Sequence, residues 1–258
     1  MFRFPACIRL FGFVLSLLPL AAAAEAPAVA AASSLQSALG EIAAQFHTDT
    51  GKAVRLSFGS SGNFYRQIAQ GAPFEIFFSA DEAYIDKLAQ ADLTMDEGTL
   101  YAAGRIVLFA PHGSALGADE QGGDLKAALD DGRVRRFAIA NPEHAPYGHA
   151  AKEALQSLGL WSSIKPKLVL GENVSQAAQF AIGGSTQGGI FAYSLALAPN
   201  VAEQGVFVLL PEHLHQPLRQ RVVLVRNAGE TAQRFYSYVQ QPPARAIFRR
   251  YGFVLPGE

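Results

Sequence analysis

Short apolar runs alternate with longer amphipathic segments along the chain from Ala28 onward, and glycine or small polar residues mark each change. In the first cycle the apolar run Val29 to Ala32 is followed by apolar residues at helical spacing from Leu35 to Phe46, and Gly51 ends the pattern. A short apolar run predicts a buried strand, and a period near 3.6 predicts a helix. The repeated order of strand, polar turn and helix indicates the α/β class.

The same reading of the whole chain gives a set of expected elements. Strands are predicted at residues 29–32, 53–58, 75–78, 105–110, 137–140, 168–170, 190–193, 206–210 and 219–225. Helices are predicted at residues 81–90, 125–129, 147–158, 174–182, 230–239 and 244–251, after two earlier helices that end near Gly51 and Gly71. Two groups of α/β units result.

The apolar runs at 105–110 and 219–225 are interpreted as strands that cross between these groups. Two crossings predict two α/β lobes, one discontinuous lobe of residues 25–105 and 219–258 and a second lobe of residues 106–218. Small ligands favour clefts between domains and the carboxyl ends of strands in open α/β sheets. We therefore expect a hinged ligand cleft between the lobes.

The first 24 residues have the composition of a secretory signal peptide. Arg3 and Arg9 precede the apolar run from Leu10 to Leu20, and small residues follow at Ala22 to Ala24. The run is too short for the ~20 residues that span a bilayer. Cys7 precedes the run, whereas a lipidated cysteine would follow it. We expect cleavage near Ala24 and an exported chain without cysteine.

Composition excludes several classes of protein. The chain has 21 Lys plus Arg against 22 Asp plus Glu, so it lacks the basic excess with which proteins neutralise a nucleic-acid backbone. A single cysteine excludes an intrachain disulfide framework and a cysteine-rich metal site. No nucleic-acid partner is expected.

Small polar residues mark four predicted junctions where a helix follows a strand. These junctions are Ser33-Ser34, Ser60-Ser61, Pro146-Tyr147 and Asn173-Val174. Unpaired amides and a partial positive charge make a helix N-terminus an anion site, although a single serine there is more often an ordinary cap. The immediate turns contain no Lys or Arg. Neutral donors suit a fully deprotonated oxyanion, whereas protonated phosphate would also need an acceptor.

Enzyme and metal motifs are weak or absent in the sequence. The run Gly59-Ser60-Ser61-Gly62 lacks the Gly-x-Ser-x-Gly spacing of a nucleophile elbow, and no phosphate-binding or dinucleotide glycine motif occurs. His213 and His215 have no third metal ligand placed by spacing. His144 is interpreted as a surface residue. We expect neither an enzyme nor a cofactor or metal cation.

Several ordered motifs carry a family resemblance. They are Ala31-Ala32-Ser33-Ser34-Leu35, Ser57-Phe58-Gly59-Ser60-Ser61-Gly62, Gly71-Ala72-Pro73-Phe74-Glu75, Ser79-Ala80-Asp81, Asn141-Pro142-Glu143-His144-Ala145-Pro146-Tyr147-Gly148, Ala151-Lys152-Glu153-Ala154-Leu155, Gly171-Glu172-Asn173-Val174 and Ile247-Phe248-Arg249-Arg250-Tyr251-Gly252-Phe253. With them the chain resembles the periplasmic molybdate-binding proteins of molybdate ABC transporters, which have the type II periplasmic binding protein fold. The resemblance implies a monomeric periplasmic protein that captures molybdate and tungstate and delivers the anion to an ABC transporter permease.

The resemblance also implies the residues that hold the anion. By the matching motifs these are Ser34, Ser61, Tyr147 and Val174, with Ser33 as an auxiliary ligand. Many relatives have a tyrosine directly after a Gly-Ile-Val run, but here Ala192 takes that place and Tyr193 follows. On a strand a shift of one residue moves a side chain to the other face, which puts a ligand role for Tyr193 in doubt.

Two alternatives remain open from the sequence. A receptor for another tetrahedral oxyanion, such as sulfate, would need the same donors and differ only in cleft size. An exported serine hydrolase would use Ser61 or Ser34 as its nucleophile, although the sequence shows no recognisable base.

Overall fold

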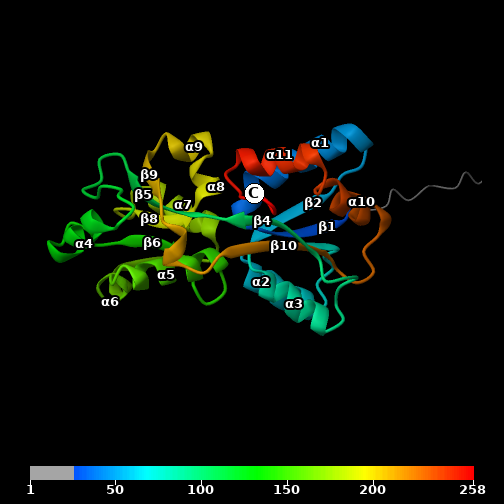
Figure 1. Ribbon diagram of the computed structural model, residues 1–258, viewed down its shortest axis with the longest axis horizontal. Coiled ribbons are helices and arrows are strands. Elements are labelled where there is room, and N and C mark those ends of the chain that lie inside the picture. The colour runs from blue at the N-terminus through cyan, green and yellow to red at the C-terminus, as the bar shows by residue number, and fades with distance from the viewer. Residues whose placement is uncertain (1–25) are drawn as a thin grey trace, which may run out of the picture.

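The computed structural model describes residues 26–258, which form two lobes side by side (Figure 1). Each lobe has a sheet covered by helices, which confirms the predicted two-lobed α/β fold. The predicted signal peptide, residues 1–24, lies outside the described residues. Across residues 26–258, no helix combines the length and apolar character that crossing a membrane requires.

The first sheet has the strand order β2-β1-β3-β10-β4. Its strands are β1 (Ala28–Ala32), β2 (Arg55–Gly59), β3 (Ile76–Ser79), β4 (Thr99–Gly104) and β10 (Leu218–Leu224). β1 pairs in parallel with β2 and β3, and β10 runs antiparallel to β3 and β4. Every residue of β1 is buried, as expected for a parallel strand covered on both faces.

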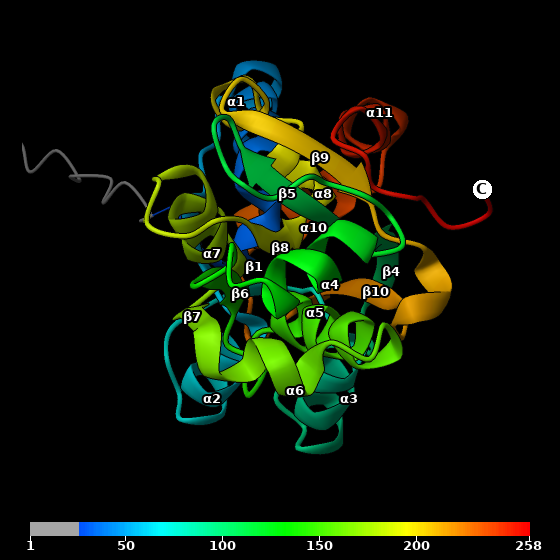
Figure 2. The same cartoon turned by 90° about the vertical axis from the view of Figure 1, so that its left-hand side faces the viewer.

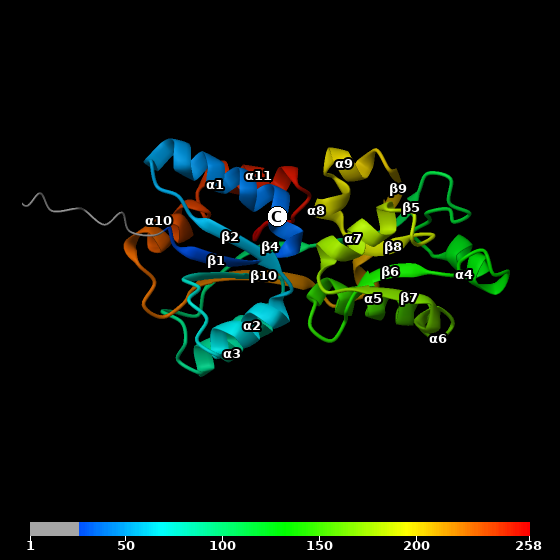
Figure 3. The same ribbon diagram turned by 180° about the vertical axis from the view of Figure 1, so that it is seen from behind.

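Helices cover both faces of this sheet (Figures 1 and 3). They are α1 (Gln36–Thr50), which follows the short 3-10 helix η1 (Ser33–Leu35), α2 (Ser61–Ala69), α3 (Glu82–Gln90), α10 (Glu230–Tyr238) and α11 (Pro242–Arg250). α1 and α11 lie on one side, and α2 and α3 lie on the other. α1 buries Leu39, Ile42 and Phe46 against the sheet, which confirms its predicted apolar face.

The second sheet has the order β7-β6-β8-β5-β9. Its strands are β5 (Ile106–Pro111), β6 (Phe137–Ala140), β7 (Leu168–Gly171), β8 (Gly189–Ala192) and β9 (Gly205–Leu209). The helices of this lobe are α4 (Gly123–Asp130), α5 (Pro146–Ser157), α6 (Trp161–Ile164), α7 (Val174–Ile182), α8 (Tyr193–Ala196) and α9 (Pro199–Ala202). Figure 2 shows α5 and α6 on one side of β6 and β8 and α8 on the other.

The chain passes between the sheets twice. The first passage lies at Gly104–Arg105, between β4 and β5, and the second runs through residues 210–217, which include the 3-10 helix η3 (Glu212–Leu214). Strand β4 was not predicted, because its sequence TLYAAG contains small and polar residues in place of a continuous apolar run. β4 and β10 pair with each other in the first sheet. The first passage therefore leaves this sheet from β4, and the second returns to it at the neighbouring strand β10.

Candidate functional site

A small cavity lies where four helical segments begin, at the boundary between the lobes. It leaves about 10 Å³ for the centre of a water-sized sphere, which is about the space that one water molecule needs. The first lobe contributes Ala32, Ser33, Gly59, Ser60, Ser61 and Ala80, and the second lobe contributes Ala145, Pro146, Tyr147 and Val174. The cavity therefore brings together residues from all four junctions singled out in the sequence.

Two serine hydroxyls at the cavity already accept hydrogen bonds from the protein. Ser61 Oγ accepts from the Ala80 amide at 2.9 Å, and Ser33 Oγ accepts from the Ser175 amide at 3.2 Å. Both serines are buried. Because an amide can only donate, each hydroxyl keeps its own proton for another acceptor. These two serines are therefore suited to donate to an anion.

Ser34 lies one residue further along, beside Tyr147. Its Oγ is buried and has no hydrogen-bond partner among residues 26–258. Burial raises the pKa of the Tyr147 phenol to about 12, and the neighbouring Ser34 and Gln220 side chains oppose this increase. The phenol is therefore neutral at physiological pH. An unpartnered buried hydroxyl costs about 1–3 kcal/mol, which a bound acceptor would offset.

Two helices present backbone amides to the same cavity. α5 begins at Pro146, which has no N–H, so Tyr147 carries the first amide of that helix. α7 begins at Val174, and its cap residue Asn173 accepts from the amide of Gln176 at 3.1 Å. The first amides of a helix have no partner within it, and the helix dipole favours an anion there.

The residues that line the cavity carry no charge. His144 does not line the cavity, but its Nδ1 lies 2.9 Å from Ser60 Oγ, which does. His144 Nε2 lies 3.5 Å from a carboxylate oxygen of Glu172, which is an exposed residue. The sequence interpretation of His144 as a surface residue is wrong, because this histidine is buried between the lobes.

Direct contacts hold the lobes together around the cavity. The Gly62 amide donates to the His144 carbonyl at 2.9 Å, and the Ser194 hydroxyl donates to the Ser34 carbonyl at 2.8 Å. Ser60 and His144 form a third contact between the lobes. The two lobes are therefore closed on each other in this structure.

Tyr193 does not line this cavity. The sequence placed it at the end of a strand, but β8 ends at Ala192 and Tyr193 is the first residue of α8. Its ring lies 6.1 Å from that of Phe207, and a Cβ built on Gly252 would lie 2.5 Å from its Cδ1. The ring therefore faces the C-terminal segment, and the expected strand geometry was wrong because the chain turns into a helix here.

Removal of the Tyr193 hydroxyl is expected to leave anion binding nearly unchanged. The Tyr193→Phe variant keeps the ring that packs against Phe207 and removes only the hydroxyl of a residue that does not line the cavity. Calorimetric titration with molybdate should give a dissociation constant within about threefold of the wild-type value. A loss above ~1.5 kcal/mol, the scale of one hydrogen bond to a charged group, would contradict this assignment.

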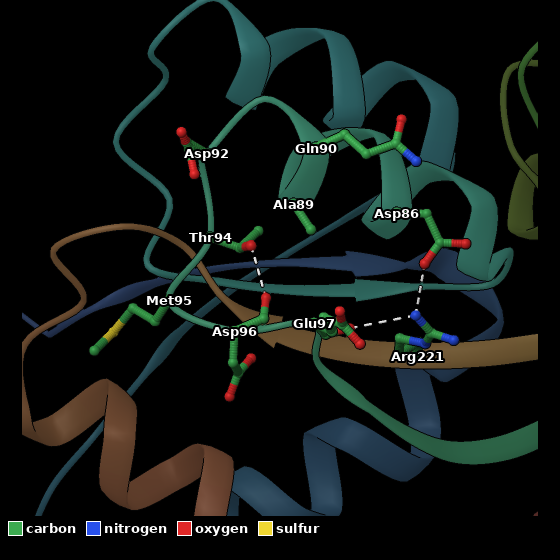
Figure 4. A pocket seen from close by; sticks show the side chains of 9 residues that line it. All are labelled: Asp86, Ala89, Gln90, Asp92, Thr94, Met95, Asp96, Glu97 and Arg221. Atoms are coloured by element: carbon green, nitrogen blue, oxygen red, sulfur yellow. Dashed lines mark hydrogen bonds and ion pairs between the residues drawn. The ribbon is translucent and has the colours of Figure 1, made fainter.

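A second, wider pocket lies on the outer surface of the first lobe (Figure 4). Four of its lining side chains are the carboxylates Asp86, Asp92, Asp96 and Glu97. Its one lining cation, Arg221, binds Asp86 at 2.6 Å and the Glu97 carbonyl at 3.3 Å. The net negative charge disfavours an anion, so this pocket does not compete with the cavity between the lobes.

The structure places His213 in the short helix η3 and His215 directly after it. His215 Nδ1 contacts the Gln216 carbonyl at 2.7 Å. Within residues 26–258, no cluster of three or more His, Cys, Asp or Glu side chains has an arrangement that could hold a metal ion.

Sequence reasoning missed two buried polar residues near the cavity. Gln220 on β10 donates to the Tyr147 hydroxyl at 2.8 Å, and Tyr101 on β4 donates to Gln220 at 2.7 Å. The only sequence signal was a glutamine inside an apolar strand, LRQRVVL, which alone does not point to a site.

The chain is similar to several known proteins. A family model described as bacterial extracellular solute-binding protein matches residues 27–254. The molybdate-binding protein ModA of Rhodobacter capsulatus is 36% identical over 98% of this chain and 99% of its own length. ModA of Escherichia coli K12 is 36% identical over 88% of each chain.

Solved structures give the same result. The periplasmic molybdate-binding protein of Azotobacter vinelandii superposes with a TM-score of 0.81 and 33% identity, covering 89% of this chain and 99% of its own. The resemblance found in the sequence is confirmed by these relatives. Since the family model and the relatives both span nearly all of it, the chain belongs to the family of bacterial extracellular solute-binding proteins.

Proposed function

We propose that this protein is an exported receptor that captures molybdate, and also tungstate, between its lobes and delivers the anion to an ABC transporter permease. The observation that carries the proposal is the small cavity between the lobes at four helix N-termini, whose uncharged lining includes serine hydroxyls and backbone amides with protons to donate. The names of the relatives identify the anion, because the donors alone would suit any small tetrahedral dianion.

In this proposal the anion accepts hydrogen bonds from side chains and amides together. Ser34 and Ser61 donate through their hydroxyls, and Tyr147 and Val174 donate through their amides. Ser33 is a further donor, because its hydroxyl lines the cavity and already accepts from Ser175. Tyr193 is left out of the set.

The donors available are sufficient for tight binding. A nanomolar dissociation constant corresponds to about 12 kcal/mol, and a hydrogen bond to a charged group contributes roughly 1.5–3 kcal/mol. About six such bonds would therefore suffice before ordering costs. The binding free energy of about 12 kcal/mol is more than an anion of this size would reach at about 1.5 kcal/mol per heavy atom, the limit for very small ligands. Lobe closure and desolvation must therefore contribute as well.

Capture would proceed by closure of two lobes, residues 26–105 with 219–258 and residues 106–218, about the two passages of the chain. The contacts of Gly62 with His144 and of Ser194 with Ser34 would form on closure. We propose that the protein acts as a monomer in the periplasm, the compartment for which the Azotobacter vinelandii relative is named.

A receptor for sulfate is the second candidate, because the same neutral donors would hold it. A hydrolase is disfavoured: Ser61 bonds the Ala80 amide, and Ser34 has no base within hydrogen-bond reach among residues 26–258. Titration calorimetry with molybdate and sulfate distinguishes the two receptors, and tight binding of sulfate would reject the proposed function.

A further inference from the structure

Two helices that begin at the cavity share one pattern of hydrogen bonds at their N-termini. One is α2 of the first lobe, which begins at Ser61, and the other is α7 of the second lobe, which begins at Val174. Both of these first residues line the cavity. The first amides of a helix have no acceptor within the helix, so they need partners from outside it.

The third amide of each helix is capped from within its own lobe. In α2, the Asn63 amide donates to the side chain of the N-cap residue Ser60 at 3.4 Å. In α7, the Gln176 amide donates to the side chain of the N-cap residue Asn173 at 3.1 Å. Because donor and acceptor belong to the same turn, these two caps do not depend on contact between the lobes.

The second amide of each helix is capped by the opposite lobe. In α2, the Gly62 amide donates to the His144 carbonyl of the second lobe at 2.9 Å. In α7, the Ser175 amide donates to the Ser33 hydroxyl of the first lobe at 3.2 Å. The capping is therefore reciprocal, because each lobe supplies the acceptor for a helix of the other lobe.

The side chains of two residues in these caps make further contacts across the boundary. His144 is buried, and its Nδ1 lies 2.9 Å from Ser60 Oγ while its Nε2 lies 3.5 Å from a carboxylate oxygen of Glu172, in the turn before α7. The Ser175 hydroxyl donates to Gln36 Oε1 of the first lobe at 3.0 Å. Neither His144 nor Ser175 lines the cavity. Both residues therefore join the lobes from outside it.

We propose that reciprocal capping is a latch that holds the lobes closed over the anion, and that His144 and Ser175 are its positioning residues. This inference rests on the lobe closure of the proposed function. In an open form water would solvate the two second amides, and closure replaces that water with acceptors of the opposite lobe. A hydrogen bond made only in the closed form shifts the equilibrium toward that form by its own free energy.

A latch of this kind acts on release of the anion more than on its capture. The contacts form after the anion has entered an open cleft, so their loss should leave the association rate nearly unchanged and increase the dissociation rate. They also contribute nothing to the stability of the open, empty protein. A residue needed only for folding would instead lower the unfolding midpoint of the empty protein.

The variants His144→Ala and Ser175→Ala test the latch with molybdate as the probe. Calorimetry measures the dissociation constant, and a chase of bound radiolabelled molybdate with unlabelled molybdate measures the release rate. We expect each variant to weaken binding and accelerate release about 3- to 10-fold, the scale of a neutral hydrogen bond. The two losses should multiply in the double variant, because the residues belong to separate contacts.

A double-mutant cycle within one contact adds a second test. Ser60→Ala removes the partner of the His144 ring, so the Ser60→Ala, His144→Ala double variant should lose less affinity than the product of the single losses. A loss equal to that product would contradict a direct bond between the two side chains across the boundary.

The matched controls remove a histidine and a serine whose contacts lie within the second lobe. His149 Nδ1 lies 3.6 Å from a carboxylate oxygen of Glu153, and the Ser157 hydroxyl donates to the Leu214 carbonyl at 2.9 Å. His149→Ala and Ser157→Ala should bind and release molybdate as wild type does.

Two results would overturn the latch. One is a wild-type release rate in both His144→Ala and Ser175→Ala. The other is a loss of affinity that is confined to the association rate and accompanied by a lower unfolding midpoint of the empty protein. Either result, beside tight binding by wild type, rejects the latch alone, whereas failure of wild type to bind molybdate rejects the proposed function itself.

Discussion

The Gly62→Ala variant is expected to bind molybdate roughly 10- to 100-fold more weakly than wild type. A Cβ at residue 62 would lie 2.6 Å from the His144 carbonyl oxygen and 3.0 Å from its Cα, both backbone atoms of the other lobe. It would also lie 2.8 Å from the Tyr84 hydroxyl, the far end of a side chain that can shift. Overpacking of this kind costs about 1–3 kcal/mol. Because the crowded atoms belong to different lobes, the added methyl group destabilises the closed form, and binding weakens by the corresponding factor.

Gly40→Ala is the matched control for this substitution. Gly40 also lies within a helix, α1, and a Cβ there would meet no atom within 4 Å. The control should bind molybdate as wild type does and gain up to about 1 kcal/mol of stability, the difference between glycine and alanine in a helix. Wild-type affinity in Gly62→Ala, measured by calorimetry beside this control, would contradict the role of the close contact between the lobes.

Ser61→Ala should reduce molybdate affinity about 10- to 100-fold, because it removes a hydroxyl whose proton is free to donate to the anion. Its oxygen accepts from the Ala80 amide at 2.9 Å, which fixes the direction of its proton. A hydrogen bond to a charged group contributes about 1.5–3 kcal/mol. The substitution also leaves the Ala80 amide without its acceptor, so the unfolding midpoint should fall slightly.

Calorimetry on Ser61→Ala and on Ser237→Ala separates a site effect from a general effect of removing a serine hydroxyl. Ser237 lies on α10, and its hydroxyl donates to the Gln233 carbonyl at 3.1 Å on an exposed surface. We expect no change in affinity for that control. Unchanged affinity in both Ser61→Ala and Ser34→Ala would reject the proposed ligand set.

Most of the fold was predictable because its strands are buried on both faces. The runs at β1, β5 and β6 are continuous and apolar, and their short length and the turns that bound them favour strands over helices. The edge strand β4 and the short helices α8 and α9 were missed. Their sequences have no sustained period, and tertiary pairing decides their structure.

The candidate site was predictable only in part, for a different reason. Ser61, Tyr147 and Val174 stand at helix N-termini, and those positions can be read from a strand followed by a polar turn. Gln220 and Tyr101 are distant in sequence from Ser34 and from each other, so only the folded chain brings them to Tyr147. Burial of His144 likewise depends on contact between the lobes.

The most direct test of the account is titration calorimetry of the exported chain with molybdate, tungstate, sulfate and phosphate in one buffer. A cavity of neutral donors that encloses a fully deprotonated anion predicts tight binding of molybdate and tungstate, with one anion per chain. Phosphate should bind far more weakly, because its proton would lack an acceptor. Tight binding of sulfate in preference to molybdate, or binding of none of the four anions, would contradict the account.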